Sequence, residues 1–254
     1  MPFARSMARA LLACTLLVSF PMHASVVISS TRVIYPADAH DITVRLTNRR
    51  PVPALVEAWI EHDGPHATPD AVPFVITPPL FRLEAGKGQA LRVHRLPATL
   101  PSDRESLFWL NVLDVPAEAS KAVDGTTLKM AVRSRLKVFV RPPGLPGSAN
   151  RAPGRLVWQL IEEGDVPVLR IDNPTPFHVT ISRVLVGDAL DFRGEMVGPF
   201  SQLSLSLDAP DLAGTAVDAR VRAEALRAAG RVGFHAVDDA GGIVPHTARI
   251  PTTR

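Results

Sequence analysis

Residues 125–141, GTTLKMAVRSRLKVFVR, reveal the fold class of this chain most plainly. Even positions from Leu128 to Val140 are apolar apart from Ser134, while most odd positions are basic. Alternation with a period of two is typical of an amphipathic β-strand. Such a strand buries its even face in its own core or, at a sheet edge, offers unpaired amides to another chain. Periodicity alone favours the first interpretation, and the sequence leaves the second open.

Similar short strands are expected on the N-terminal side of this one. They are rich in β-branched residues, and turns containing Pro, Gly or Asp separate them. About seven short strands at this spacing favour an immunoglobulin-like β-sandwich. The expected strands are residues 25–35, 41–47, 54–60, 74–84, 90–95, 106–115 and 127–140. Thr77, Pro78 and Pro79 predict a tight turn inside the fourth of them, with a cis peptide bond as one alternative.

A linker is predicted at residues 141–154, RPPGLPGSANRAPG, which contain four prolines and three glycines. Proline lacks an amide hydrogen, so no strand can continue through this stretch. Beyond it the strand pattern resumes, and we predict a second sandwich. The all-β chain would thus have domains at residues 25–144 and 145–254. The expected strands are residues 156–161, 166–171, 178–186, 202–207, 217–221 and 232–236, whereas residues 223–229 are helix-like in composition and stay undecided between helix and strand.

Residues 1–24 have the pattern of a secretory signal peptide. Arg5 and Arg9 precede an apolar run of 11 residues, which is shorter than the roughly 20 needed to span a bilayer. We place cleavage after Ala24, and a lipoprotein signal ending before Cys14 is the competing interpretation. Cleavage would remove two arginines and lower the net charge from +3 to +1, which argues against a nucleic-acid binder. It would also remove the only cysteine, so no disulfide is expected.

The sequence contains none of the motifs we sought for hydrolases, metalloproteases or nucleotide-binding proteins. The densest set of titratable residues is EHDGPH at residues 61–66. These residues could ligate a metal, but Asp-Gly-Pro is strong turn chemistry and favours a solvated turn. We therefore predict a protein that is not an enzyme and that needs neither metal nor cofactor.

Five segments together resemble the periplasmic chaperones of chaperone–usher pili. Each motif is weak alone, but their order behind a signal peptide makes the resemblance specific. It implies two immunoglobulin-like domains in an L or boomerang arrangement, and a protein that holds pilin subunits by lending them a β-strand. The segments are residues 31–35 (TRVIY), 77–83 (TPPLFRL), 100–111 (LPSDRESLFWLN), 135–142 (RLKVFVRP) and 172–177 (DNPTPF).

The resemblance also implies roles for individual residues. Arg32 and Lys137 match the two basic residues that bind the C-terminal carboxylate of the pilin in the cleft between the domains. Leu128, Met130 and Val132 match the alternating donor-strand residues that enter the groove of an incomplete pilin. An ideal strand places Lys137 and these even positions on opposite faces. Either a bulge or twist intervenes, or the stretch from Leu136 onward serves this protein's own core.

Glu105, Arg141 and Asp239 match an inter-domain network of ion pairs, to which we assign the orientation of the domains. The segment before the donor strand, residues 116–126, is short and resembles the short-loop subfamily. The resemblance implies a periplasmic location, pilin subunits and an outer-membrane usher as partners, and no embedding in a membrane. A self-capping homodimer through the open edge stays undecided. The alternative function is a secreted β-sandwich binding module or adhesin subunit without catalysis.

Overall fold

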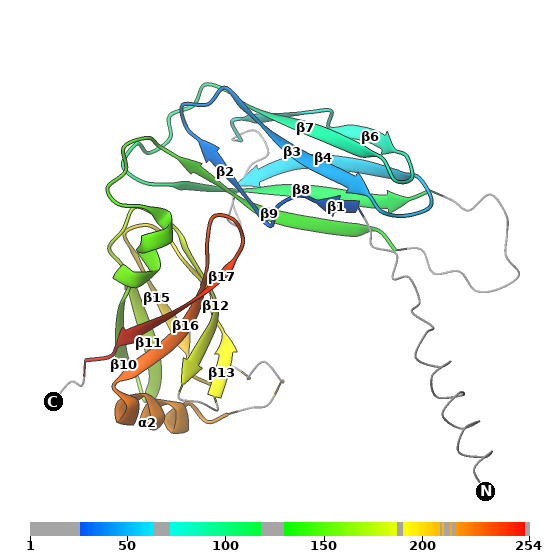
Figure 1. Ribbon diagram of the computed structural model, residues 1–254. Coiled ribbons are helices and arrows are strands. Elements are labelled where there is room, and N and C mark those ends of the chain that lie inside the picture. Colours follow the sequence, from blue (N-terminus) through cyan, green and yellow to red (C-terminus); the bar gives the residue numbers. More distant parts are fainter. Residues whose placement is uncertain are drawn as a thin grey trace, which may run out of the picture.

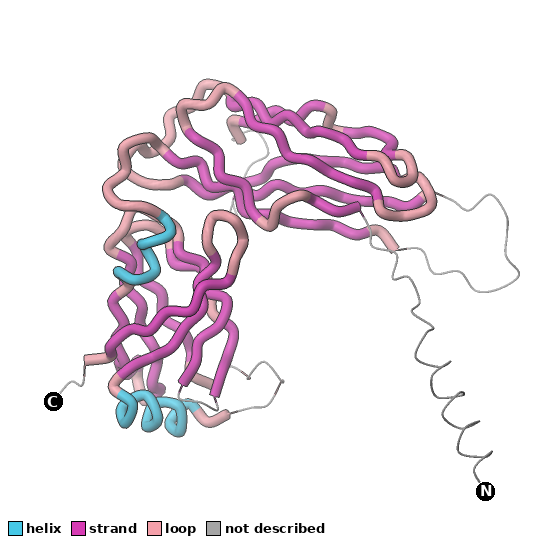
Figure 2. The backbone as a smooth tube through the Cα atoms, viewed as in Figure 1, coloured by secondary structure: helices cyan, strands magenta, loops and turns pink. Residues whose placement is uncertain are grey.

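The protein folds into two β-sandwiches that meet like the arms of an L, as a computed structural model shows (Figure 1). The structure describes residues 26–62, 72–117, 130–186, 190–208, 210, 214 and 217–251. Strands dominate both arms and helices are few (Figure 2). Within these ranges, no helix has the length and apolar character needed to cross a membrane. The predicted fold class of two immunoglobulin-like sandwiches is confirmed.

The N-terminal sandwich consists of a four-stranded and a five-stranded sheet. All neighbouring strands are antiparallel except β2 and β9, which run parallel. The smaller sheet has the order β1 (Val26–Ile28), β3 (Asp41–Asn48), β7 (Gly88–Arg95) and β5 (Phe74–Thr77). The larger sheet has the order β2 (Arg32–Pro36), β9 (Val132–Arg141), β8 (Ser106–Pro116), β4 (Ala54–His62) and β6 (Leu80–Leu83).

Two of the predicted single strands are each divided between the two sheets. Residues 25–35 give β1 in the smaller sheet and β2 in the larger one, and residues 74–84 give β5 and β6 in the same way. The second division falls at a cis peptide bond between Thr77 and Pro78, which confirms the predicted turn. Composition could not reveal either division, because a strand that changes sheets keeps its β-branched residues on both sides of the crossing.

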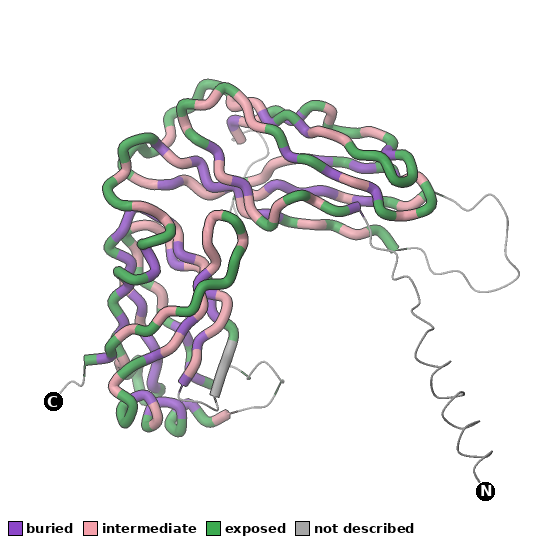
Figure 3. The backbone as a smooth tube through the Cα atoms, viewed as in Figure 1, coloured by how far each residue is buried: buried purple, intermediate pink, exposed green. Residues whose placement is uncertain are grey.

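The C-terminal half of β9 serves the protein's own core. Leu136, Val138 and Val140 are buried in the N-terminal core, and the β8–β9 register runs without a shift from one end to the other. No bulge therefore turns the strand, and of the two explanations offered by the sequence the second is confirmed. Buried segments lie along the inner faces of both sandwiches (Figure 3).

The C-terminal sandwich follows a short 3-10 helix, η2 (Ala149–Arg155), at the end of the predicted linker. Its core is a separate cluster in which Trp158 packs on Phe234, with ring centroids 4.8 Å apart. One sheet has the order β10 (Val157–Glu163), β11 (Val166–Asn173) and β15 (Ser201–Ser206). The other has the order β13 (Leu190–Arg193), β12 (Val179–Val186), β16 (Arg231–Val237) and β17 (Ile243–Arg249), with β14 (Met196–Val197) also pairing with β12.

The strand predicted at residues 217–221 is wrong, because this region begins the helix α2 (Ala219–Ala229). Asp218 caps the first turn by accepting a hydrogen bond from the Arg220 amide, and Gly230 ends the helix at a φ of 60°. The helix-like composition of residues 223–229 was therefore the better signal. Ala223 and Leu226 anchor the helix in the C-terminal core.

Candidate functional site

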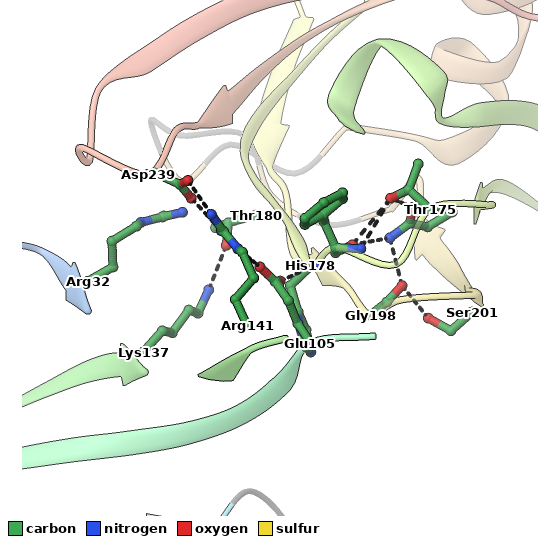
Figure 4. A network of polar contacts seen from close by, with 12 residues as sticks. Arg32, Glu105, Lys137, Arg141, Thr175, His178, Thr180, Gly198, Ser201 and Asp239 are labelled. Atoms are coloured by element: carbon green, nitrogen blue, oxygen red, sulfur yellow. Dashed lines mark hydrogen bonds and ion pairs between the residues drawn. The ribbon is translucent and has the colours of Figure 1, made fainter. Parts of the chain in front are cut away.

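Arg32 and Lys137 lie directly opposite each other where the two domains meet. They are paired in the parallel register of β2 and β9, at the residue with which β2 begins. Arg32 Nη1 donates a hydrogen bond to the Val237 carbonyl at 3.0 Å. Lys137 Nζ donates one to Thr180 Oγ1 at 3.2 Å (Figure 4). Both basic side chains thus extend from the N-terminal domain to atoms of the C-terminal domain.

The environment of Arg32 leaves one of its donors without an acceptor. Burial lowers the pKa of Arg32, although the nearby carboxylates of Asp239 and Asp238 act in the opposite direction. The guanidinium lies 5.8 Å from the centre of the Phe139 ring. Its Nε is buried and has no hydrogen-bond partner within the described residues. Because buried donors are nearly always paired, an unpaired nitrogen at the domain boundary is an uncommon feature.

Glu105, Arg141 and Asp239 form one ion-pair network across the domain boundary. Arg141 Nε lies 2.7 Å from Glu105 Oε1, while Nη1 and Nη2 lie 2.7 and 2.8 Å from the two carboxylate oxygens of Asp239. Burial acts to lower the pKa of Arg141, but its hydrogen bonds and attraction to both carboxylates outweigh burial and raise that pKa. The structure therefore brings together the three residues that the resemblance grouped (Figure 4).

His178 is a member of this network that sequence reasoning missed. Its amide donates to Glu105 Oε2 at 2.8 Å, and its ring Nδ1 lies 3.2 Å from the same oxygen. The ring also packs on Phe139, with centroids 5.2 Å apart. The Glu105 side chain is only 1% exposed, so these contacts satisfy a carboxylate that water hardly reaches. The position of His178 directly after the DNPTPF motif was the available signal.

The DNPTPF motif forms the turn that presents His178 to Glu105. Asn173 is fully buried and donates from Nδ2 to the carbonyls of Phe177 and Gly198, each at 2.7 Å. Its Oδ1 accepts from the amide and the hydroxyl of Thr175 at 3.1 and 2.7 Å. These four bonds hold the turn between β11 and β12. In this turn, the Pro176 carbonyl accepts a hydrogen bond from the Glu105 amide. One buried amide thus positions the C-terminal side of the network.

The turn between β16 and β17 supplies Asp239, and the Val237 carbonyl lies at the end of β16 directly before this turn. Asp238 closes this turn, since its amide donates to the Gly242 carbonyl and its Oδ1 accepts from the Gly242 amide. Gly241 has a φ of 86°, and a Cβ added to it would collide with the Thr31 hydroxyl just before β2. Glycine is required here by both conformation and close approach. Sequence reasoning found Asp239 in this turn but had no signal for the Val237 carbonyl.

The N-terminal half of β9 has an open edge. β2 pairs only with the residues from Lys137 to Arg141, and no described strand pairs with that side of β9 between Val132 and Leu136. Val132 is half-buried and Met130, just before the strand, is 60% exposed. Leu128 lies outside the described residues. Strand β9 is therefore an edge strand only in its first half, which the alternation of residues could not reveal.

The residues considered as metal ligands have other contacts. Glu61 forms ion pairs with Arg133 at 3.0 Å and Arg135 at 2.8 Å. His62 packs edge-on against Phe108, with centroids 5.2 Å apart. Residues 63–66 lie outside the described part of the chain. No group of three or more potential metal ligands occurs within that part.

Comparison with known proteins decides the family. Residues 25–146 match the N-terminal domain of the pili and flagellar-assembly chaperone PapD family, and residues 151–248 match the C-terminal domain of the pili assembly chaperone PapD. The chain belongs to the pili assembly chaperones. This assignment agrees with the prediction that the protein is not an enzyme.

Individual pili assembly chaperones are similar over most of the chain. Chaperone protein FimB/FhaD of Bordetella pertussis is 41% identical over 89% of this chain and 88% of its own length. The crystal structure of the YadV chaperone, a probable fimbrial chaperone of Escherichia coli, is 36% identical and has a TM-score of 0.68 over 89% of this chain and all of that one. A structure of the Salmonella enterica SafA pilin in complex with the SafB chaperone matches with 29% identity and a TM-score of 0.70, over 89% of this chain and 96% of that one.

Proposed function

We propose that this pili assembly chaperone works in the periplasm, where it binds an incomplete pilin subunit and completes its fold with strand β9. The family assignment supports this function, as does the similarity to a chaperone solved together with a pilin. The observation that carries the proposal is the pairing of Arg32 with Lys137 at the end of the open edge. There a strand arriving along β9 would meet two cations at the point where β2 begins.

The two cations are proposed to bind the C-terminal carboxylate of the subunit. Lys137 offers an ammonium and Arg32 offers a guanidinium whose buried Nε has no acceptor within the described residues. Charge-assisted hydrogen bonds of this kind contribute about 1.5–3 kcal/mol each. Because the carboxylate marks the end of a chain, it would set the register of everything that precedes it. A slip by one residue would turn every side chain to the wrong face.

The position of the anchor also sets the direction of the incoming strand. The open edge extends from Val132 to Leu136, and the anchor lies at its C-terminal end. A strand that ends at the anchor must therefore run parallel to β9. Met130 and Val132 would point into the subunit, as would Leu128, and each buried side chain contributes about 1.5–3 kcal/mol. Lys137 can point to the other face without conflict, because it contacts the end of the subunit strand and not its side chains.

Several finer assignments belong to the same proposal. The short segment at residues 116–126 supports the short-loop subfamily. Residues 25–144 and 145–254 would be the two domains of the mature protein, after a signal peptide removed behind Ala24. Glu105, Arg141 and Asp239 would hold the angle between these domains. Further partners would be an outer-membrane usher and, through the open edge of β9 in the free protein, a second copy of the chain.

Peptide binding tests the carboxylate anchor directly. The probe is a 12-residue peptide with the C-terminal sequence of the pilin encoded beside the gene, made with a free carboxylate or as an amide. We expect the free acid to bind wild type about tenfold or more tightly than the amide, because the amide cannot form the two charge-assisted hydrogen bonds of the carboxylate. Arg32→Ala and Lys137→Ala should bind both peptides equally weakly.

Lys87→Ala is the matched control, because Lys87 is an exposed lysine in a turn of the same domain. It should keep the preference for the free acid. Co-expression with the complete pilin gives an independent measurement, in which wild type but not Lys137→Ala should recover a stable complex. Equal affinity of wild type for the acid and the amide would refute the anchor.

A further inference from the structure

The outer face of the five-stranded sheet carries a lattice of basic, aromatic and acidic side chains over the open half of β9. Arg133 and Arg135 project from β9, Trp109 and Asn111 from β8, and Glu61 from β4. Glu61 accepts from Arg133 Nη2 through Oε2 at 3.0 Å and from Arg135 Nε through Oε1 at 2.8 Å. Each oxygen of one carboxylate thus binds a separate arginine, and both arginines reach across the intervening strand β8 to β4.

Stacking and a side-chain amide hold the same two arginines in place. The Arg135 guanidinium lies 4.0 Å from the centre of the Trp109 ring, and that of Arg133 lies 5.0 Å from the centre of the Trp59 ring. Arg133 also donates from Nε and Nη2 to Asn111 Oδ1 at 3.0 and 2.8 Å. All of these contacts lie on the face opposite Leu136, and they engage the part of β9 that β2 does not cover.

We propose that this lattice keeps the open half of β9 straight and aligned, so that the strand is ready to pair with an incoming chain. A strand segment with one neighbour has half of its in-plane hydrogen bonds unmade and would fray. The side-chain contacts across the outer face hold this segment in place of a second neighbouring strand, and they leave its free edge open to an incoming chain. Glu61 is therefore a positioning residue for donor-strand binding, acting through Arg133 and Arg135. This inference rests on the proposed function, whose anchor is a different set of residues.

Removing the ion pairs of the lattice should slow the association of a peptide without changing the preference for the free acid. A strand that is already ordered loses less conformational freedom on binding, so ordering it in advance strengthens association. Glu61→Gln keeps the shape of the side chain and removes both ion pairs. Partly exposed pairs contribute little individually, and we expect the association rate of the free-acid peptide to fall about twofold to fivefold. The preference for acid over amide should stay unchanged, because the anchor is intact.

Hydrogen exchange of the free protein tests the cause. In Glu61→Gln, those amides of residues 132–136 that hydrogen-bond to β8 should exchange about twofold to fivefold faster than in wild type, while the amides of residues 138–140 should not change. Glu84→Gln is the matched control, since Glu84 forms an exposed ion pair with Arg82 on the same sheet at 2.6 Å. A double-mutant cycle with Arg135→Gln should show that the two changes are not additive.

The two possible failures are distinguishable. If wild type prefers the free acid but Glu61→Gln associates at the same rate, the positioning role is wrong and the proposed function stands. If the exchange rates of residues 132–136 are unchanged in Glu61→Gln, the lattice does not order this half of β9, regardless of the rate at which the peptide binds. If wild type itself does not prefer the free acid, the proposed anchor fails, and the exchange data alone then decide whether Glu61 orders the strand.

Discussion

Replacing Arg141 with alanine should loosen the junction between the domains while leaving both cores folded. The guanidinium makes one hydrogen bond to Glu105 and two to Asp239, all between 2.7 and 2.8 Å. The side chains of Glu105, Arg141 and Asp239 are 1%, 22% and 33% exposed, respectively. Solvent therefore screens the Asp239 pair much more than the Glu105 pair.

The magnitude follows from these exposures. The bond to the buried Glu105 carboxylate contributes about 1.5–3 kcal/mol, and the screened Asp239 pair adds about 0.5–1 kcal/mol. His178 continues to donate to Glu105 from its amide, which limits the cost of the vacated partner. Glu105 and Arg141 both lie in the N-terminal domain, so only the Asp239 pair of Arg141 crosses the boundary. We expect a loss of about 0.5–1 kcal/mol from the free energy that holds the domains together, and of about 1.5–3 kcal/mol from the stability of the N-terminal domain.

Small-angle scattering and calorimetry measure this loss. Arg141→Ala should broaden the distribution of inter-domain distances in scattering, and its thermal unfolding should separate into two transitions as the domains uncouple. Arg92→Ala is the control, because Arg92 forms an exposed pair with Asp41 at 2.7 Å on the other sheet of the N-terminal domain. If both variants scatter and unfold alike, the network does not set the domain angle and this reasoning is refuted.

Two further predictions concern the C-terminal domain. Asn173→Ala should lower the free energy of unfolding of this domain by about 2–4 kcal/mol in urea titrations, because buried partners in the turn lose their hydrogen bonds. Gln202→Ala is the exposed control, and an Asn173→Ala effect no larger than that of the control would contradict this prediction. Burial lowers the pKa of His246, so the unfolded chain binds a proton more readily, and wild type should lose stability as the pH falls from about 6.5 toward the lowered folded value. His246→Phe retains an aromatic ring against Phe234 and should remove this part of the acid sensitivity; an unchanged slope of stability against pH would show that His246 is not its source.

Period-two alternation, turn residues and the proline-rich linker determined the fold class and the two-domain organisation from the sequence. Each of these signals acts over a few residues, so a single sequence can carry it. These signals predicted the wrong strands where the local preference of a segment differs from its pairing in the tertiary structure. Residues 25–35 and 74–84 look like single strands but contribute to two sheets each, and residues 217–221 look like a strand but enter α2.

The candidate site shows the same division between local and long-range information. The resemblance selected Arg32, Lys137, Glu105, Arg141 and Asp239, because their residue types recur in recognisable motifs. Only the tertiary structure places Arg32 opposite Lys137 and brings His178 to Glu105, since these contacts join residues more than 70 positions apart. The open edge of β9 is also a tertiary property. Among the described strands, β2 pairs with β9 only from Lys137 onward, because β2 begins at Arg32. The sequence of β9 alone does not indicate where β2 begins.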